Sequence, residues 1–264
     1  MSLVFTKMHG LGNDFVVIEA TSDTAVPDAA RWRALADRHT GIGFDQALVI
    51  MPPRNSAAAA FYRIFNADDS EVEQCGNGAR CVAEWLRLHG KAGPLALDSA
   101  GGRIEAIFAA PGLVSVNMGV PRFVDSGESA LDIDGQTHRF TQVSMGNPHA
   151  VIFVTDVDKA PVATLGPQLE SHPFFPKRTN VAFLQIVDAR RARLRVFERG
   201  VGETLACGTG ACAAMATARR LGRLESQAEI ALPGGTLQLR WDGGESALWM
   251  TGPAAVSFRG TIDN

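Results

Sequence analysis

One short pattern occurs twice in this chain, at positions half a chain length apart in a sequence of 264 residues. Cys-Gly-Asn-Gly-Ala at residues 75–79 returns as Cys-Gly-Thr-Gly-Ala at residues 207–211. Each copy runs directly into a helix-forming stretch, residues 80–88 and residues 212–221. The thiol is therefore expected at or next to a helix N-terminus, where free backbone N–H groups and the helix dipole stabilise anions and lower the pKa of a cysteine.

The repeat extends well beyond these glycine turns. Residues 63–66 (Arg-Ile-Phe-Asn) align in the same register with residues 195–198 (Arg-Val-Phe-Glu), and both segments are predicted to be strands. Nearer the N-terminus, the pair Gly12-Asn13 aligns with Gly146-Asn147, and each pair precedes an apolar strand. The copies run from about residue 3 to 119 and from about residue 137 to 252. The chain is therefore predicted to contain the same structural unit twice.

The repeat predicts the domain limits. We expect residues 1–119 to form one half and residues 120–252 the other. Residues 120–135, which are rich in Asp, Ser and Gly, are expected to be the crossover between the halves. The tail, residues 253–264, has no counterpart in the repeat and is expected to return to the first half.

Each half is predicted as several short strands around one central helix, the helix that follows the Cys-Gly-X-Gly turn. The central helices are apolar on most faces, which is typical of a buried helix wrapped by a sheet. Further helices are predicted outside the sheets, at residues 28–38 and 160–169. The predicted fold class is α+β, with two pseudo-symmetric domains and mainly antiparallel sheets.

Composition excludes several classes of protein. Apolar residues make up 46% of the chain and charged residues 20%, as in ordinary globular proteins. A formal net charge of −3 gives no electrostatic footprint for nucleic acid or an anionic membrane. No apolar run approaches the roughly 18 residues that span a bilayer. Four cysteines are too few for a disulfide scaffold, so we expect a cytoplasmic protein with reduced thiols.

The two turns suit one kind of chemistry. Their glycines free the backbone to surround an anion with N–H groups, as at phosphate and carboxylate sites on helix ends. If the halves face each other, the two thiols can approach one substrate carbon from opposite sides. A thiolate and a thiol placed in this way can remove a proton from one face and deliver a proton to the other, which is the reaction of a racemase or epimerase. This chemistry requires neither a metal nor a cofactor, and we expect none.

Seven stretches spread over nearly the whole length form a highly specific set. They are residues 9–15 (HGLGNDF), 41–46 (GIGFDQ), 75–81 (CGNGARC), 145–149 (MGNPH), 179–181 (TNV), 198–200 (ERG) and 202–210 (GETLACGTG). On these residues the chain resembles the diaminopimelate epimerases. The resemblance implies a cofactor-independent enzyme that interconverts L,L- and meso-diaminopimelate in bacterial lysine and peptidoglycan synthesis. It also implies two pseudo-symmetric domains and a cleft that closes on the substrate.

The resemblance also implies roles for individual residues. Cys75 and Cys207 are the implied acid/base pair, and in the L,L to meso direction we expect Cys207 to accept the proton and Cys75 to donate it. His149 and Glu198 are implied to tune the thiols, and Glu198 also lines the substrate pocket. The amides expected to hold the carboxylate of the reacting centre are those of Gly76, Asn77, Gly208 and Thr209. The side chains expected to recognise the distal end of the substrate are Arg199, Asn13, Asn66, Asn147 and Asn180, with Gln46 in the same pocket.

Several residues also have a purely structural interpretation. Cys81 and Cys212 could pair with the repeated cysteines as metal ligands, but their spacing and their place in apolar helices favour inert core thiols. His149 alone could be an ordinary structural histidine, and the pair Glu198-Arg199 a solvated strand end. Asn13 and its counterpart in the second half could form turns as well as bind substrate.

Three rival functions remain at this point. A proline or hydroxyproline racemase would also use paired cysteines, but Glu198-Arg199 and the asparagines favour a substrate with a polar second end. A thiol redox or metal-binding protein is disfavoured because the chain has no Cys-x2-Cys motif. A non-catalytic carboxylate-binding module would need no cysteines. The expected partner is a small amino-acid substrate; the oligomeric state is not determined by the sequence, and a homodimer is compatible with it.

Overall fold

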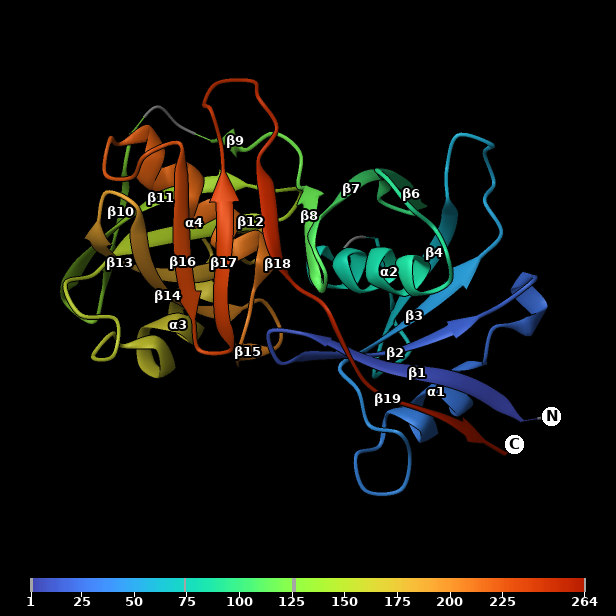
Figure 1. Cartoon of the computed structure of the whole chain (residues 1–264). Coiled ribbons are helices and arrows are strands. Elements are labelled where there is room, and N and C mark those ends of the chain that lie inside the picture. Colours follow the sequence, from blue (N-terminus) through green and yellow to red (C-terminus); the bar gives the residue numbers. More distant parts are fainter. Residues whose placement is uncertain (1, 74, 125–126, 264) are drawn as a thin grey trace. The chain divides into compact units, whose positions relative to one another are not determined.

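The computed structural model describes residues 2–73, 75–124 and 127–263 (Figure 1). The chain forms two compact units. Unit 1 comprises Met1–Val116 and Thr251–Asn264, and unit 2 comprises Asn117–Met250. The chain passes from one unit to the other within β8 (Leu113–Asn117) and returns within β18 (Trp249–Pro253).

Unit 1 is a mainly antiparallel sheet with one central helix and one outer helix. The pairs β2–β3 and β4–β6 are parallel, whereas β1–β2, β1–β19, β3–β4, β4–β5, β6–β7 and β7–β8 are antiparallel. The remaining strands of this unit are β1 (Leu3–Gly10), β2 (Asn13–Glu19), β3 (Gln46–Met51), β4 (Ala60–Asn66), β5 (Glu71–Val72), β6 (Leu95–Ser99), β7 (Gly102–Ala110) and β19 (Ala255–Ile262). Its helices are the short 3-10 helix η1 (Asp23–Ala25), the outer helix α1 (Ala29–Ala36) and the central helix α2 (Gly76–Leu88).

Unit 2 repeats this pattern. Its parallel pairs, β12–β13 and β14–β16, occupy the same places in the order as those of unit 1. Its other strands are β9 (Arg122–Phe123), β10 (Ser129–Ile133), β11 (Gln136–Ser144), β12 (Pro148–Phe153), β13 (Asn180–Asp188), β14 (Arg191–Glu198), β15 (Gly202–Thr204), β16 (Gln227–Leu232) and β17 (Gly235–Arg240). Its helices are the outer α3 (Val162–Glu170) and the central α4 (Gly208–Arg220). The predicted α+β class with two repeated halves is confirmed.

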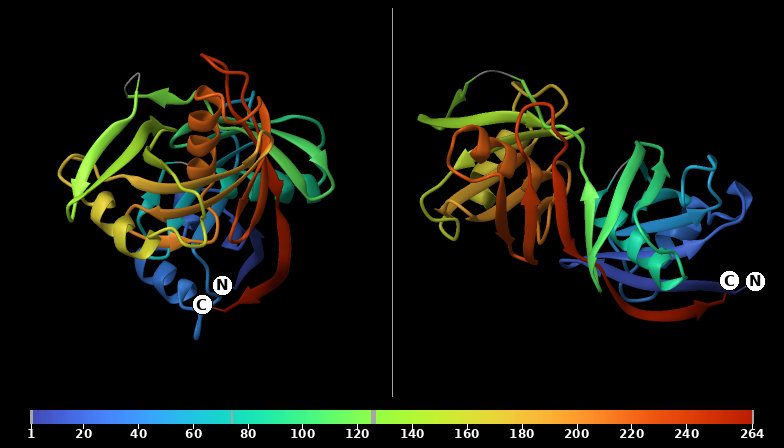
Figure 2. Two further views of the ribbon diagram at one scale, coloured as in Figure 1. Left: turned by 90° about the vertical axis from the view of Figure 1, so that its left-hand side faces the viewer. Right: turned by 45° about the horizontal axis from the view of Figure 1, so that its top comes forward.

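The central and outer helices pack on opposite faces of their sheets. Along β2, Val16 and Ile18 pack with Trp32 of α1 in one cluster, while Phe15 points the other way, toward the start of α2. This alternation is the period of two expected of a strand buried on both faces. Both central helices are almost wholly buried, and in Figure 2 the strands of each unit curve around them.

The strand that pairs with β1 and the strand that pairs with its counterpart β11 come from different places in the sequence. In unit 1, β19 pairs with β1, with Leu3 opposite Ile262. In unit 2, β10 pairs with β11, with Ser129 opposite Phe140. The residues expected to serve only as a crossover, 120–135, thus include β9 and β10 and lie within unit 2. The added strand covers a row of backbone N–H and C=O groups on β11 that would otherwise be an open edge.

No helix in the described part of the chain is long and apolar enough to span a bilayer.

Candidate active site

Each unit places its repeated cysteine as the N-cap of its central helix. Cys75 has extended backbone angles (φ −145°, ψ 113°), and its sulfur accepts a hydrogen bond from Gly78 N at 3.4 Å. Cys207 takes the same position before α4 (φ −104°, ψ 105°), with its sulfur 3.7 Å from Thr209 Oγ1. The thiol of Cys75 is half-buried, whereas Cys207 is only 3% exposed. The predicted placement of both thiols at helix N-termini is confirmed.

The pKa of Cys207 is raised well above its usual value, opposite to the expectation from the helix end alone. Burial is the largest cause, followed by the charge of Glu198 and a hydrogen bond to that carboxylate. The N–H of Gly210 and the hydroxyl of Thr209 act in the opposite direction but do not outweigh these effects. The sequence indicates the helix dipole but not the burial, which favours the neutral thiol. Cys207 is therefore a protonated thiol at neutral pH, with a carboxylate beside it.

Glu198, the last residue of β14, is held in place by β15. Thr204 Oγ1 donates a hydrogen bond to Glu198 Oε1 at 2.5 Å, and Glu198 pairs across the strands with Gly202. A carboxylate that hydrogen-bonds a thiol can accept its proton when a nearby charge stabilises the thiolate. Glu198 is thus placed to act on Cys207.

His149 is buried and connects to Cys207 through hydrogen bonds within unit 2. Its Nε2 lies 3.0 Å from Asn147 Oδ1, and Asn147 Nδ2 donates to Thr209 Oγ1 at 3.3 Å. Because the amide oxygen can only accept, Nε2 must carry the proton, and Nδ1 is left as a buried acceptor with no partner among the described residues. Burial, and then the cation of Arg199, lower the pKa of His149 to about 3. His149 is therefore neutral.

Asn180 and Arg199 lie side by side in unit 2. Asn180 faces His149 across the parallel pair β12–β13. Its Oδ1 accepts a hydrogen bond from Arg199 N at 3.0 Å, and its Nδ2 donates to Pro148 O at 2.9 Å. The Arg199 guanidinium donates to Lys177 O at 3.0 Å. Asn180 thus ties the Arg199 turn to the start of β12.

The predicted polar residues of unit 1 form two amide pairs. Gln46 faces Asn66 across β3–β4, and Gln46 Nε2 donates to Asn66 Oδ1 at 2.9 Å. Gln46 Oε1 is buried without a partner among the described residues. In the second pair, Asn77 Nδ2 donates to Asn13 Oδ1 at 3.2 Å. The buried Gln46 Oε1 can accept a hydrogen bond, which suits the ammonium group of a zwitterionic ligand.

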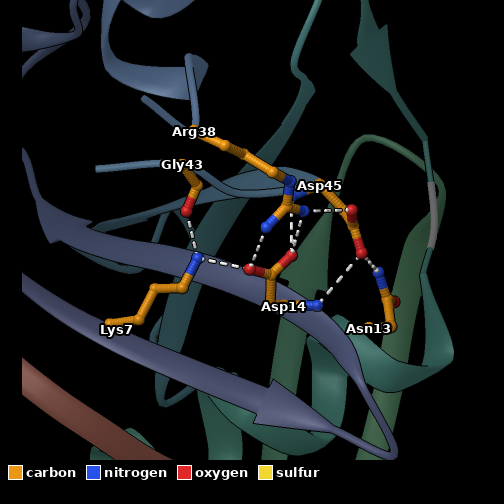
Figure 3. A network of polar contacts seen from close by, with 6 residues as sticks. All are labelled: Lys7, Asn13, Asp14, Arg38, Gly43 and Asp45. Carbon is orange, nitrogen blue, oxygen red and sulfur yellow. Dashed lines mark hydrogen bonds and ion pairs between the residues drawn. The ribbon is translucent and has the colours of Figure 1, made fainter. Parts of the chain in front are cut away.

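Two charged clusters near these residues were missed by sequence reasoning. In unit 1, Lys7 and Arg38 bind Asp14, and Arg38 also binds Asp45 (Figure 3). In unit 2, the buried Glu170 accepts hydrogen bonds from Gly200 N at 3.0 Å and forms an ion pair with Arg178 at 3.2 Å. Asp14 and Asp45 lie inside the stretches 9–15 and 41–46 that carry the family resemblance. That resemblance was the signal by which they could have been found. Glu170 lies in none of those stretches.

Asp14 is the centre of the unit 1 cluster. Arg38 binds both of its oxygens, at 2.8 and 3.0 Å, and Lys7 binds one at 2.5 Å. Lys7 also donates to Gly43 O. Burial acts to raise the pKa of Asp14, but hydrogen bonds and charge from Arg38 and Lys7 outweigh it and lower the value to about 2.

The remaining cysteines are core residues. Cys81 and Cys212 are fully buried inside the central helices, and burial raises the pKa of Cys81 to about 12. The described residues contain no group of three or more His, Cys, Asp or Glu side chains that could hold a metal ion.

Comparison with known proteins identifies the family of this chain and its fold. The family model for diaminopimelate epimerase matches residues 5–124 and 141–257. A diaminopimelate epimerase from Nitrosomonas europaea is 50% identical over 275 residues, covering 100% of both chains. A solved hydroxyproline epimerase from Agrobacterium vitis, with bound trans-4-OH-L-proline, has a TM-score of 0.75 at 16% identity and covers 99% of this chain and 92% of its own. A Bacillus anthracis phenazine biosynthesis protein of the PhzF family has a TM-score of 0.75 at 15% identity and full coverage of both chains. The two structural matches show the fold alone.

Proposed function

Because this chain belongs to the diaminopimelate epimerase family, we propose that Cys75 and Cys207 invert one α-carbon of diaminopimelate by a two-base proton transfer. The family makes the protein an isomerase of lysine biosynthesis. The observation that carries the mechanism is the buried Cys207 thiol at the N-terminus of α4, hydrogen-bonded to Glu198.

In the L,L to meso direction, Glu198 takes the proton of Cys207, and the resulting thiolate removes the α-proton from one face. The electrons of the broken C–H bond move into the adjacent carboxylate, which becomes enolate-like. Cys75 then delivers its thiol proton to the opposite face, so the configuration is inverted and Cys75 becomes the thiolate. In the other direction the two cysteines exchange roles. His149, neutral and linked to Cys207 through Asn147 and Thr209, supports the same thiol.

The turns before the two central helices supply charge stabilisation. We assign the N–H groups of Gly76, Asn77, Gly208 and Thr209 to the carboxylate of the reacting centre. Donors fixed in advance at helix N-termini stabilise the charge that develops as the proton leaves. The transfer itself uses only thiols, carboxylate and amides of this chain.

Recognition of the distal amino-acid end falls to polar groups from both units. Arg199 is the cation available for the distal carboxylate, because a guanidinium can bind both carboxylate oxygens. Amides contributed by Asn13, Gln46, Asn66, Asn147 and Asn180 complete this set. We propose domain limits near residues 119/120 and 252/253, with each half supplying one cysteine. A cytoplasmic location follows from the need for two free thiols, which a reducing compartment preserves.

Proton exchange into diaminopimelate tests the proposal. In deuterated water the protein is expected to exchange the α-proton of diaminopimelate, and Cys75→Ala or Cys207→Ala is expected to abolish epimerisation. Exchange into proline with none into diaminopimelate would overturn the substrate assignment. The match to hydroxyproline epimerase makes proline the informative alternative substrate, although at 16% identity that match shows only a shared fold.

A further inference from the structure

A chain of four hydrogen-bonded side chains crosses unit 1 beside the turn that carries Cys75. Asn13 Nδ2 donates to Asp45 Oδ2 at 2.9 Å, and Asn77 Nδ2 donates to Asn13 Oδ1 at 3.2 Å. At the far end, Arg80 Nη2 donates to Asn77 Oδ1 at 3.0 Å. Arg80 is fully buried and lies close to β1, since a Cβ on Gly10 would be 3.0 Å from its Nη2.

The charged groups at the two ends, Asp45 and Arg80, determine the direction of every hydrogen bond among these four side chains. An ionised carboxylate such as Asp45 can only accept, and a guanidinium such as Arg80 can only donate. Asn13 must therefore turn its NH2 toward Asp45, which leaves its oxygen for Asn77. Asn77 must turn its oxygen toward Arg80, which leaves its NH2 for Asn13. Neither amide can rotate by 180° without placing two donors or two acceptors against each other.

The corresponding residues of unit 2 have the opposite amide direction. Asn147 corresponds to Asn13, and Thr209 corresponds to Asn77 as the second residue of the central helix. There Asn147 donates its Nδ2 to Thr209 and accepts from His149. Thr179, which corresponds to Asp45, donates its hydroxyl to Asn180 O, and among the described residues it forms no hydrogen bond with Asn147. The acceptor that orients Asn13 is therefore a feature of unit 1 alone.

Asp45 is itself held on several sides (Figure 3). Its Oδ1 accepts from Arg38 Nη2 at 2.7 Å, and its Oδ2 also accepts from Asp14 N at 3.1 Å. Its backbone N donates to Asp14 Oδ1 at 3.0 Å. Because Asp14 is in turn bound by Lys7 and Arg38, the position of the Asp45 carboxylate is set before any ligand arrives.

We propose that Asp45 is a positioning residue that orients Asn13 for recognition of a substrate carboxylate. Asn13 donates one of its two side-chain N–H groups to Asp45, and its oxygen accepts from Asn77. Its second N–H has no hydrogen-bond acceptor among the described residues. That N–H remains able to donate to a carboxylate oxygen of the substrate. The inference rests on the proposed function, because Asn13 belongs to the proposed substrate site.

The test is Asp45→Asn, which keeps the shape but allows the side chain to donate as well as accept. The new side chain can turn its own NH2 toward Asn13 Nδ2, so Asn13 is then held only through its oxygen at Asn77 and its remaining N–H is no longer fixed in direction. KM for diaminopimelate should therefore rise about tenfold while kcat stays within about twofold. A merely structural defect would lower kcat by reducing the active fraction and leave KM unchanged. The matched control is Asp98→Asn in β6, whose carboxylate pairs with Arg103 at 2.7 Å away from this chain of side chains. Both its kinetic constants should match those of the wild type.

A measurement on the wild type keeps the inference testable if Asp45→Asn fails to fold. With 15N-labelled asparagine, the side-chain amide of Asn13 is expected to show one proton shifted downfield and protected from exchange, since a carboxylate holds it. Two equivalent, rapidly exchanging protons, or an unchanged KM in a folded Asp45→Asn, would overturn the role of Asp45. Absence of α-proton exchange by the wild type would instead reject the proposed function, so the two failures are distinguishable.

Discussion

Asn13 and Asn147 occupy equivalent turns, yet they present opposite ends of their amides to the second residue of the central helix. Asn13 offers its oxygen to Asn77, whereas Asn147 offers its NH2 to Thr209. The duplicated fold therefore carries two thiols at equivalent positions with non-equivalent polar surroundings. A substrate in which one stereocentre reacts and the other does not requires this kind of asymmetry, because the proton chemistry is symmetric but recognition is not.

Glu198→Gln should lower the pKa of Cys207, because the carboxylate raises it by charge and by hydrogen bonding. It should also lower kcat by about 10²-fold, the smaller end of what general-base catalysis contributes. The pH dependence of Cys207 alkylation measures the first effect, and epimerisation the second. Glu203→Gln on the neighbouring strand, which pairs with Arg195 at 2.6 Å, is the control. An unchanged alkylation profile in Glu198→Gln would contradict the assignment.

His149 should make the protein less stable as the pH falls from about 6.5 to about 3. Its pKa is lower in the folded state, so the unfolded chain binds a proton in this range while the folded chain does not. The resulting slope is up to about 1.4 kcal/mol of unfolding free energy per pH unit. His149→Phe, which introduces the residue found at the equivalent position 15, should remove that slope in urea unfolding at pH 4–6. Between pH 7.5 and 8.5, plots of unfolding free energy against pH should run parallel for the wild type and His149→Phe. If the two plots also run parallel at pH 4–6, the prediction is refuted.

Asp14→Asn should destabilise the protein by about 3 kcal/mol, the typical effect of leaving a buried charge without its partner. Lys7 is buried and would lose its counter-ion. Urea unfolding at pH 7 measures the loss. The more exposed pair Arg103–Asp98 offers the comparison, since Asp98→Asn should cost no more than about 1 kcal/mol. Equal losses of unfolding free energy in the two variants would show that the Asp14 cluster stabilises the protein no more than an exposed ion pair does.

Oxidation should join Cys75 to Cys207 and inactivate the enzyme, because the proposed mechanism brings both thiols to one small carbon. Peptide mass spectrometry before and after a mild oxidant identifies the bridge, and a thiol reductant should restore activity. Cys81 and Cys212 are fully buried and should stay reduced, which provides an internal control. Full activity in protein shown to carry the bridge would rule out a catalytic role for both cysteines.

The sequence predicted the repeated features of this fold well. Two glycine-rich turns before apolar helices determine helix position through local geometry alone, so the N-caps at Cys75 and Cys207 could be placed without a structure. The alignment of Asn66 with Glu198 likewise followed from strand register. Residues 120–135 were harder, because a short polar strand such as β10 has no strong hydrophobic period.

The electrostatics of the site could not be obtained from sequence. The pKa of Cys207 depends on burial and on the approach of Glu198, and both are tertiary properties. Asp45 and Glu170 act through hydrogen bonds to residues 32 or 30 positions away, which no local pattern encodes. The direction of the Asn13 amide depends in turn on its contacts with Asp45 and Asn77.

The pairing of β19 with β1 has a consequence for the order in which the protein can be completed during synthesis. The strand that finishes unit 1, β19, is synthesised after β9 to β17 of unit 2, which lie between the two parts of unit 1 in the sequence. Unit 2 can therefore finish folding while β1 still has an open edge. Unit 1 is therefore started first and completed after unit 2, and a product truncated before β19 would expose β1 to other chains.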